Sequence, residues 1–191
     1  HECGVVLVHW LETASRRACA RLRRMELTAF VLSQLPPAPA RVLEVGCGKG
    51  KLARALARKG YEVVAIDPEA PDGPIFRRTT IEEFQEDGSF DAVVASLALH
   101  HVEDLGGVLA KLVDMLRGPL ILNEHAWDRL EPMTPEWEEE HAGLHGYEAM
   151  RTELDERFEE RFFEWRPYRI DGEEVPGLGF RYVGVSKRDA R

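Results

Sequence analysis

Three glycines at alternate positions, Gly46, Gly48 and Gly50, follow directly on a short apolar run at residues 42–45. The run predicts a strand buried on both faces, as in a parallel sheet. Residues 51–59 then carry apolar side chains at helical spacing. Glycine suits such a turn because the backbone reverses sharply and a ligand can approach it without meeting a Cβ. The stretch therefore predicts the opening strand–turn–helix unit of a nucleotide-binding α/β fold.

The glycine spacing differs from that of two common nucleotide loops. A dinucleotide fingerprint needs Gly-x-Gly-x-x-Gly, whereas Lys51 stands where its third glycine would be. A phosphate loop needs Gly-Lys-Ser/Thr, and Leu52 follows Lys51. The remaining pattern is acidic-x-Gly-x-Gly-x-Gly, in which Glu44 is the acidic residue. This pattern resembles the first motif of the class I methyltransferases that use S-adenosylmethionine (SAM).

The resemblance implies a cofactor site on this loop. Its residues Gly46, Cys47, Gly48 and Gly50 are expected to contact SAM, and Cys47 stands where a small side chain fits. Because SAM carries an ammonium group rather than a pyrophosphate, the Glu44 carboxylate is expected to orient that group directly or through water.

A second match follows the next predicted strand, at residues 61–66. That strand ends in Asp67 and Pro68. In nucleotide-binding βαβ units an acidic residue about 20 positions after the glycine turn accepts hydrogen bonds from the ribose hydroxyls. An isolated Asp-Pro pair is more often a turn initiator, but beside the glycine loop the ribose role is favoured.

A third match is the segment at residues 90–101, which predicts a turn followed by a buried fourth strand. Ser96 and Leu97 at its end are expected beside the reactive methyl group, because open α/β sheets bind ligands at the carboxyl ends of their strands. Their sequence lacks the Asn-Pro-Pro-Tyr typical of enzymes that methylate nucleic-acid amino groups. By position the adenine contact falls on Thr80 and Ile81, with Thr79 and Glu82 as alternatives.

The resemblance also implies the fold class and the domain layout. We expect an α/β, Rossmann-like, doubly wound sheet of seven strands at residues 36–191, mostly parallel with an antiparallel last strand. A helical segment at 1–35 precedes it. The last two strands are expected at 161–168 and 180–186, joined by a connection at 169–179. A lid-like insertion at about 126–150 holds candidate acceptor-pocket residues: Trp127, Trp137, His141, His145 and Tyr147.

The candidate catalytic residues are His101, Glu124 and His125, which the resemblance places near the methyl group. Oxygen and nitrogen acceptors usually lose a proton during methylation, and these side chains can accept one. For the His100–His101 pair, packing or capping is the favoured alternative. His141 and His145 would share a face if that segment were helical, but no cysteine pair or His-Glu-x-x-His supports zinc, so no metal is expected.

The composition of the chain limits the kinds of partner that we expect it to bind. The 25 basic and 34 acidic side chains give a net charge of −9, which disfavours a polyanionic partner such as nucleic acid. The arginines at 16–24 are interpreted as a solvated helix face. Three cysteines without metal-ligand spacing indicate a reducing compartment, so a cytoplasmic location is expected. No apolar run approaches a membrane span, and no membrane partner is expected. The oligomeric state is not constrained.

The predicted function is a SAM-dependent methyltransferase that acts on a small-molecule acceptor. Two alternatives stay open. A non-catalytic SAM-binding regulatory module is compatible with the absence of an unambiguous catalytic residue. A protein or RNA methyltransferase would use the arginines at 16–24 to bind its macromolecule and would associate with it in a salt-sensitive way.

Overall fold

The computed structural model describes residues 26–131, 133–170 and 172–188. They fall into two units, which divide between Ser33 and Gln34. The described residues of the first unit, 26–33, are helical. Most of the helical segment predicted at 1–35 therefore lies outside the described residues, and the arginines at 16–24 lie there entirely.

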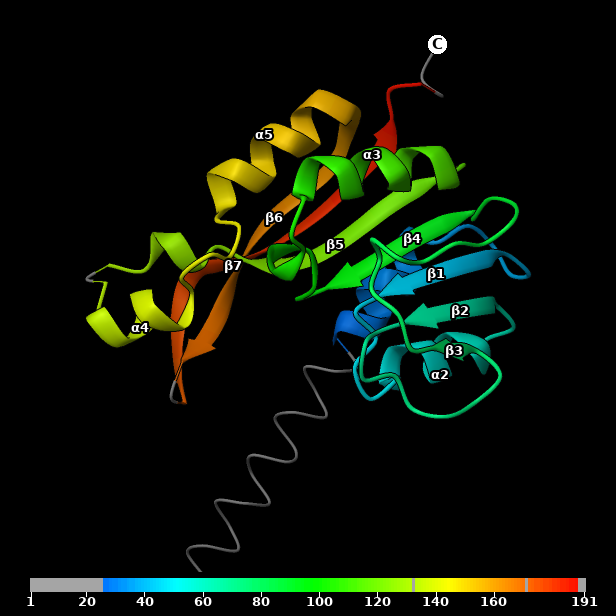
Figure 1. Ribbon diagram of the computed structural model, residues 1–191, viewed down its shortest axis with the longest axis horizontal. Helices are drawn as coiled ribbons and strands as arrows, with labels where there is room; N and C mark the ends of the chain where they lie inside the picture. The colour runs from blue at the N-terminus through cyan, green and yellow to red at the C-terminus, as the bar shows by residue number, and fades with distance from the viewer. Residues whose placement is uncertain (1–25, 132, 171, 189–191) are drawn as a thin grey trace, which may run out of the picture. The chain divides into compact units, whose positions relative to one another are not determined.

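One seven-stranded sheet organises the second unit, in the order β3-β2-β1-β4-β5-β7-β6 (Figure 1). The strands are β1 Arg41–Val45, β2 Glu62–Ile66, β3 Phe76–Arg77, β4 Ala92–Ser96, β5 Pro119–His125, β6 Phe158–Ile170 and β7 Glu173–Ser186. The first five pair in parallel, whereas β7 is antiparallel to both β5 and β6. Only β7 of these strands runs against the others. The predicted seven-stranded, mostly parallel sheet with an antiparallel last strand is confirmed.

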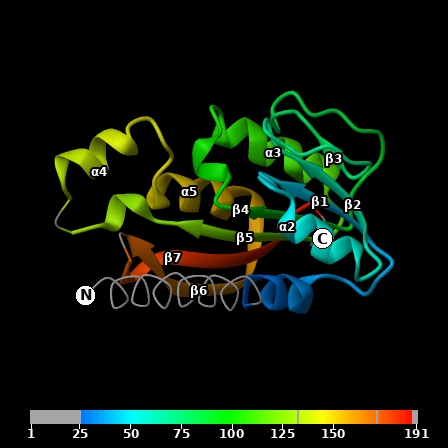
Figure 2. The ribbon, with the colours of Figure 1, turned by 90° about the horizontal axis from the view of Figure 1, so that it is seen from below.

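Helices cover both faces of the sheet (Figure 2). The helices that pack on it are α2 Lys51–Ala57, α3 Leu105–Met115 and α5 Tyr147–Arg157. The described residues also include α4 Pro135–Glu140 and the short 3-10 turns η1 Leu99–His101 and η2 Trp127–Arg129. The connection through α2 leads from β1 to β2, toward the β3 edge of the sheet. The connection through α3 leads from β4 to β5, toward the β6 edge. Right-handed crossovers therefore place α2 on one face and α3 on the other, where α5 packs against it. No helix in the described part of the chain is long and apolar enough to cross a membrane.

Strand β1 is buried on both faces, as its apolar run predicts. Leu43 and Val45 belong to the core beneath α3 and α5, while Val42 is fully buried outside that core cluster. Each such side chain stabilises the fold by about 1.5–3 kcal/mol. Helix α3 starts at Leu105, because the Asp104 side chain accepts the Gly107 N–H at 2.9 Å and caps the helix.

The carboxyl-terminal hairpin differs from the prediction. The expected connection at 169–179 is wrong, because β6 continues to Ile170 and β7 already begins at Glu173. Gly172 in the tight turn has a φ of +91°, the left-handed backbone that hairpin turns favour. Strand β5 reaches His125, and its residues Asn123–His125 pair with β7.

Candidate functional site

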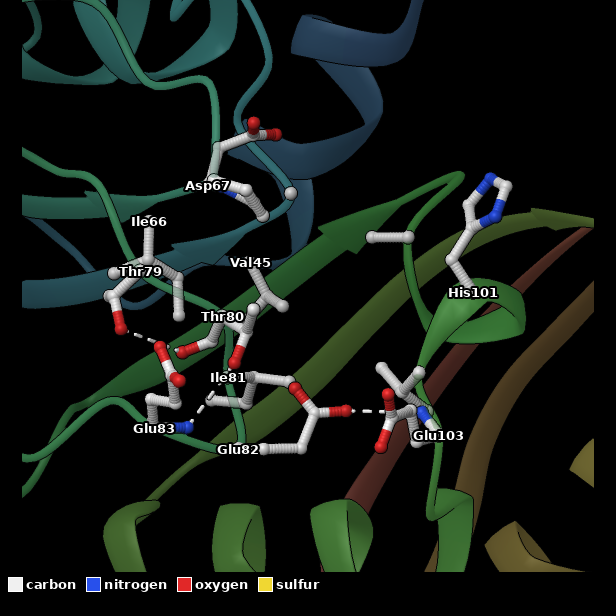
Figure 3. Close-up of a pocket in the computed structure, with 14 residues that line it drawn as sticks. Val45, Ile66, Asp67, Thr79, Thr80, Ile81, Glu82, Glu83, His101 and Glu103 are labelled. Carbon is white, nitrogen blue, oxygen red and sulfur yellow. Dashed lines mark hydrogen bonds between the residues drawn. The ribbon is translucent and has the colours of Figure 1, made fainter.

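The carboxyl ends of β1, β2 and β4 lie side by side. Val45 pairs with Ile66 on one side and with Ala95 on the other. A cavity of about 430 Å³ opens at this edge (Figure 3). It lies near the point between β1 and β4 where the crossovers reverse direction, which is where open α/β sheets bind ligands.

Part of the predicted site lines this cavity. The predicted residues on its wall are Gly46, Asp67, Pro68, Thr80, Ile81 and His101, together with the two adenine alternatives Thr79 and Glu82. The predicted residues outside its wall are Glu44, Cys47, Gly48, Gly50, Ser96, Leu97, Glu124 and His125. Six further wall residues were not predicted as site residues: Val45, Ile66, Glu83, Ala98, Val102 and Glu103. The last three follow β4 directly, and this position could have identified them.

Asp67 fastens the glycine turn to the end of β2. Its Oδ2 accepts the Gly48 N–H at 2.8 Å, and its Oδ1 accepts the Glu69 N–H at 2.8 Å. The second bond forms a turn, so Asp67 does initiate a turn while also lining the cavity. A carboxylate has about four acceptor positions. These two bonds therefore leave acceptor capacity for hydroxyl groups of a ligand.

The three glycines serve different purposes. A Cβ on Gly48 (φ +48°) would meet no atom within 4 Å, so this position is open to an approaching ligand. A Cβ on Gly46 (φ +72°) would lie 2.4 Å from the Ala98 Cβ. A Cβ on Gly50 (φ +67°) would lie 2.3 Å from the Phe76 ring. Packing therefore requires glycine at 46 and 50, whereas Gly48 leaves room for a ligand.

Gly50→Ala is expected to destabilise the fold by about 2–4 kcal/mol, because it combines left-handed strain with overpacking against Phe76. Chemical denaturation measures the free energy of unfolding. Adding Phe76→Leu should recover part of the loss, since the shorter side chain vacates the space that the new Cβ needs. A double variant whose losses simply add would contradict this packing role for Gly50.

Glu44 is a buried carboxyl group two residues before the turn. It is 4% exposed, and its Oε2 has no hydrogen-bond partner among the described residues. Burial raises its pKa to about 8; a hydrogen bond from the Ala53 backbone opposes this rise, and the Asp67 charge adds to it. An unpaired buried carboxylate oxygen beside a glycine turn fits the ammonium group of an amino-acid-bearing nucleoside.

Cys47 is buried within the turn and is not chemically activated. Burial, together with the charges of Glu44 and Asp67, raises the pKa of its thiol to about 12. The thiol therefore stays protonated and unreactive at neutral pH. This agrees with the expectation of a small packed side chain at this position.

The cavity wall is acidic. Asp67, Glu82, Glu83 and Glu103 line it, and no lysine or arginine is among the described lining residues. The Glu103 N–H donates to Glu82 Oε1 at 3.1 Å, which joins the loop after β3 to the segment after β4 (Figure 3). A wall of this charge favours a cationic ligand and disfavours a polyanion.

His101, Glu124 and His125 lie in different environments. His101 lines the cavity, and burial and the neighbouring His100 lower its pKa, so it is neutral near pH 7. Glu124 is 2% exposed and His125 is 5% exposed. Burial, followed by His100, lowers the pKa of His125 to about 3, and neither ring nitrogen has a hydrogen-bond partner among the described residues. Of the three, His101 alone reaches the cavity.

The segment between β5 and α5 folds onto itself rather than into the cavity. Trp137 Nε1 donates to the Trp127 carbonyl at 3.0 Å, and both indoles pack against His141. Helix α4 ends at Glu140, so the idea that His141 and His145 share a helix face is wrong. His145 Nε2 instead lies 2.9 Å from the Val102 carbonyl. Within the described residues no group of three potential ligands is arranged to hold a metal ion.

Comparison with known proteins finds one matching family and several proteins of similar sequence. The sequence profile of the family described as "Methyltransferase domain" matches residues 10–166. The ubiquinone biosynthesis O-methyltransferase of Rhodopseudomonas palustris is 32% identical over 113 residues, which cover 52% of this chain and 43% of that protein. The enzyme of that name from Xanthomonas axonopodis pv. citri is 35% identical over 111 residues, which cover 49% of this chain and 46% of that protein. The chain thus spans less than half the length of these curated relatives.

Among solved structures, the N-methyltransferase NodS from Bradyrhizobium japonicum, in complex with S-adenosyl-L-homocysteine (SAH), matches with a TM-score of 0.63. The match covers 87% of each chain at 19% sequence identity. This similarity establishes a shared fold.

Proposed function

This chain belongs to the methyltransferase domain family, and on that premise we propose that it transfers a methyl group from SAM to a small-molecule acceptor. The names of the curated relatives, which are O-methyltransferases of ubiquinone biosynthesis, support this proposal. So does NodS, whose structure was solved with SAH, the product that SAM leaves after methyl transfer.

One observation carries the proposal: an acidic cavity lies at the ends of β1, β2 and β4, beside a glycine turn that Asp67 fastens in place. We assign Asp67 to the ribose hydroxyls and Glu44 to the ammonium group. The remaining proposed cofactor contacts are Gly46, Cys47, Gly48 and Gly50 in the turn, Pro68, Thr80 and Ile81 near the adenine, and Ser96 and Leu97 near the methyl group.

When bound, SAM supplies a methyl group that its sulfonium has already activated. The main task of the protein is then to align the acceptor with that group and to exclude water. We assign acceptance of the acceptor's proton to His101, because it is neutral and lies on the cavity wall. The segment between β5 and α5, tied to the wall through His145 and Val102, is the proposed lid.

Isothermal titration calorimetry with SAM and SAH tests the binding part of the proposal, and turnover tests the chemistry. Methyl-labelled SAM incubated with the protein and a cell extract should yield a small labelled product. Binding without any labelled product would favour the regulatory-module alternative. Label that enters only protein or RNA, in a salt-sensitive way, would favour the macromolecular one.

SAH binding near pH 7 is expected to release close to one proton from Glu44. In the free protein the pKa of Glu44 is about 8, so this carboxyl is mostly protonated at pH 7. A bound ammonium favours the carboxylate, lowers the pKa and expels the proton. Affinity should therefore rise between pH 6 and pH 7. Titrations in buffers of different ionisation enthalpy give the number of protons released.

Glu44→Gln is the matched variant for this measurement. It keeps the shape of the side chain and removes the titrating group. The variant should bind SAH more weakly, without proton release and with little dependence on pH. Equal proton release from Glu44→Gln and the unchanged protein would contradict the ammonium assignment.

A further inference from the structure

The carboxyl group of Glu124 is fully buried and forms three hydrogen bonds. Its Oε1 accepts the N–H groups of Ala98 and Leu99, both at 2.9 Å. Its Oε2 lies 2.7 Å from Nδ1 of His100, and the Glu124 side chain is 0% exposed. The two backbone N–H groups donate to Oε1, and the His100 ring forms the third hydrogen bond, with Oε2. Glu124 therefore joins β5 to three consecutive residues that follow β4.

These donors lie in a strained turn. Leu97 has a φ of +54°, and it is the one residue other than glycine with a positive φ among the described residues. Branched side chains rarely adopt this conformation, which persists only where neighbouring structure enforces it. The adjacent β5 residue helps to enforce it, since the Asn123 carbonyl accepts the Leu97 N–H at 2.9 Å. Asn123 and Glu124 together clamp residues 97–99.

The clamped turn forms one wall of the cavity. Ala98, His101, Val102 and Glu103 line the cavity, whereas Glu124 lies behind them. Ala98 also meets the glycine turn, since a Cβ on Gly46 would come within 2.4 Å of the Ala98 Cβ. A displacement of the Ala98 backbone would therefore change both the width of the cavity and the place of His101.

We propose that Glu124 is a positioning residue, whose carboxylate holds residues 97–101 in the strained turn that shapes the cofactor side of the cavity and orients His101. This inference rests on the proposed function, because it takes the cavity to be the SAM site. It separates Glu124 from His101: Glu124 acts through the backbone and its hydrogen bonds, and it does not exchange a proton with the acceptor. What matters is then the length of its side chain, not its charge.

Two variants separate reach from charge. Glu124→Gln keeps the length of the side chain and one oxygen for the Ala98 and Leu99 N–H groups, while its amide group can donate to His100. Glu124→Asp keeps the charge but is one methylene too short to reach all three donors. Leu154→Ala is the control, because it opens a cavity in the core where α5 packs and lowers stability, while Leu154 takes no part in the hydrogen bonds of Glu124.

The measurements are the affinity for SAH by calorimetry and the amide hydrogen exchange of residues 97–101. Glu124→Gln should bind SAH within about threefold of the unchanged protein and keep the amide protection of Ala98 and Leu99. Glu124→Asp should lose that protection and bind SAH about ten- to hundredfold more weakly, because buried donors lose their acceptor. Leu154→Ala should match the unchanged protein in both measurements while unfolding at a lower temperature.

Three results would overturn the inference. The first is a Glu124→Asp variant with unchanged affinity and unchanged amide exchange. The second is a Glu124→Gln variant that binds as weakly as Glu124→Asp, because the charge would then be the decisive property. The third is an equal loss of affinity in Leu154→Ala, which would make the effect one of stability. If the unchanged protein binds no SAH, the proposed function fails, and amide exchange still decides whether Glu124 holds the turn.

Discussion

Replacing Asp67 with alanine is expected to weaken the binding of SAM and SAH at least about hundredfold. The substitution removes the proposed acceptor for the ribose hydroxyls and also the acceptor of the Gly48 N–H. A hydrogen bond to a charged group is worth about 1.5–3 kcal/mol, and each 1.4 kcal/mol changes affinity about tenfold. Calorimetric titration of SAH measures the effect.

Asp72→Ala is the matched control. Asp72 lies in the same connection between β2 and β3, and it forms an exposed ion pair with Arg78 at 2.9 Å. Such surface pairs contribute little to stability, and Asp72 does not line the cavity. This variant should bind SAH within about twofold of the unchanged protein. An Asp67→Ala variant that binds as well as Asp72→Ala would remove Asp67 from the site.

Gly48→Val is expected to abolish SAH binding detectable by calorimetry while leaving a folded protein. The new Cβ meets no protein atom within 4 Å, so the side chain extends into open space beside the glycine turn, where we expect the ligand to approach the backbone. The left-handed backbone at Gly48 (φ +48°) costs a valine about 1–2 kcal/mol, which a folded domain of this size tolerates. Circular dichroism and thermal unfolding establish that the variant is folded.

Gly143→Val controls for the strain alone. Gly143 also has a positive φ, +86°, and a Cβ there would likewise meet no atom within 4 Å. It lies between α4 and α5, outside the glycine turn. The two variants should lose similar stability, but only Gly48→Val should lose affinity. Equal affinities in the two variants would show that the open space at Gly48 is not part of the ligand site.

The parts of the fold that the sequence predicts well depend on local patterns. The run at 42–45, the three glycines and the following helix are encoded within a few residues, and the structure has them there as β1, the turn and α2. Helix α3 follows equally from its cap at Asp104 and its apolar spacing. The number of strands and the antiparallel last strand were expected from the family resemblance rather than from the residues themselves.

The carboxyl-terminal hairpin could not be predicted in detail, because long-range pairing overrides local signals. Pro176 and Gly177 usually end strands, yet they lie within β7, whose pairing with β6 is irregular near this point. Glu159 and Glu160 lie before the strand predicted at 161–168, because their charges give no local signal for a strand. They belong to β6 because it is the edge strand, where such side chains are exposed.

Within the candidate site, strand ends can be predicted from the sequence better than the directions of side chains. Asp67 and His101 follow β2 and β4 and line the cavity, as their positions predict. Glu124 and His125 also lie at a strand end, but neither lines the cavity. Side chains at successive strand positions point to opposite faces of the sheet, so a position at the strand end does not fix where a side chain points. The place of Glu124 depends on a turn formed by residues about 25 positions earlier, and no local pattern encodes that contact.

The most direct test of the central claim is a crystal structure of the protein grown with SAH. The ribose hydroxyls should lie within hydrogen-bond distance of Asp67, with the backbone of Gly48 against the ligand and the amino group on the side of Glu44. SAH bound at another surface, or a glycine turn closed by protein side chains in the presence of saturating SAH, would contradict the account.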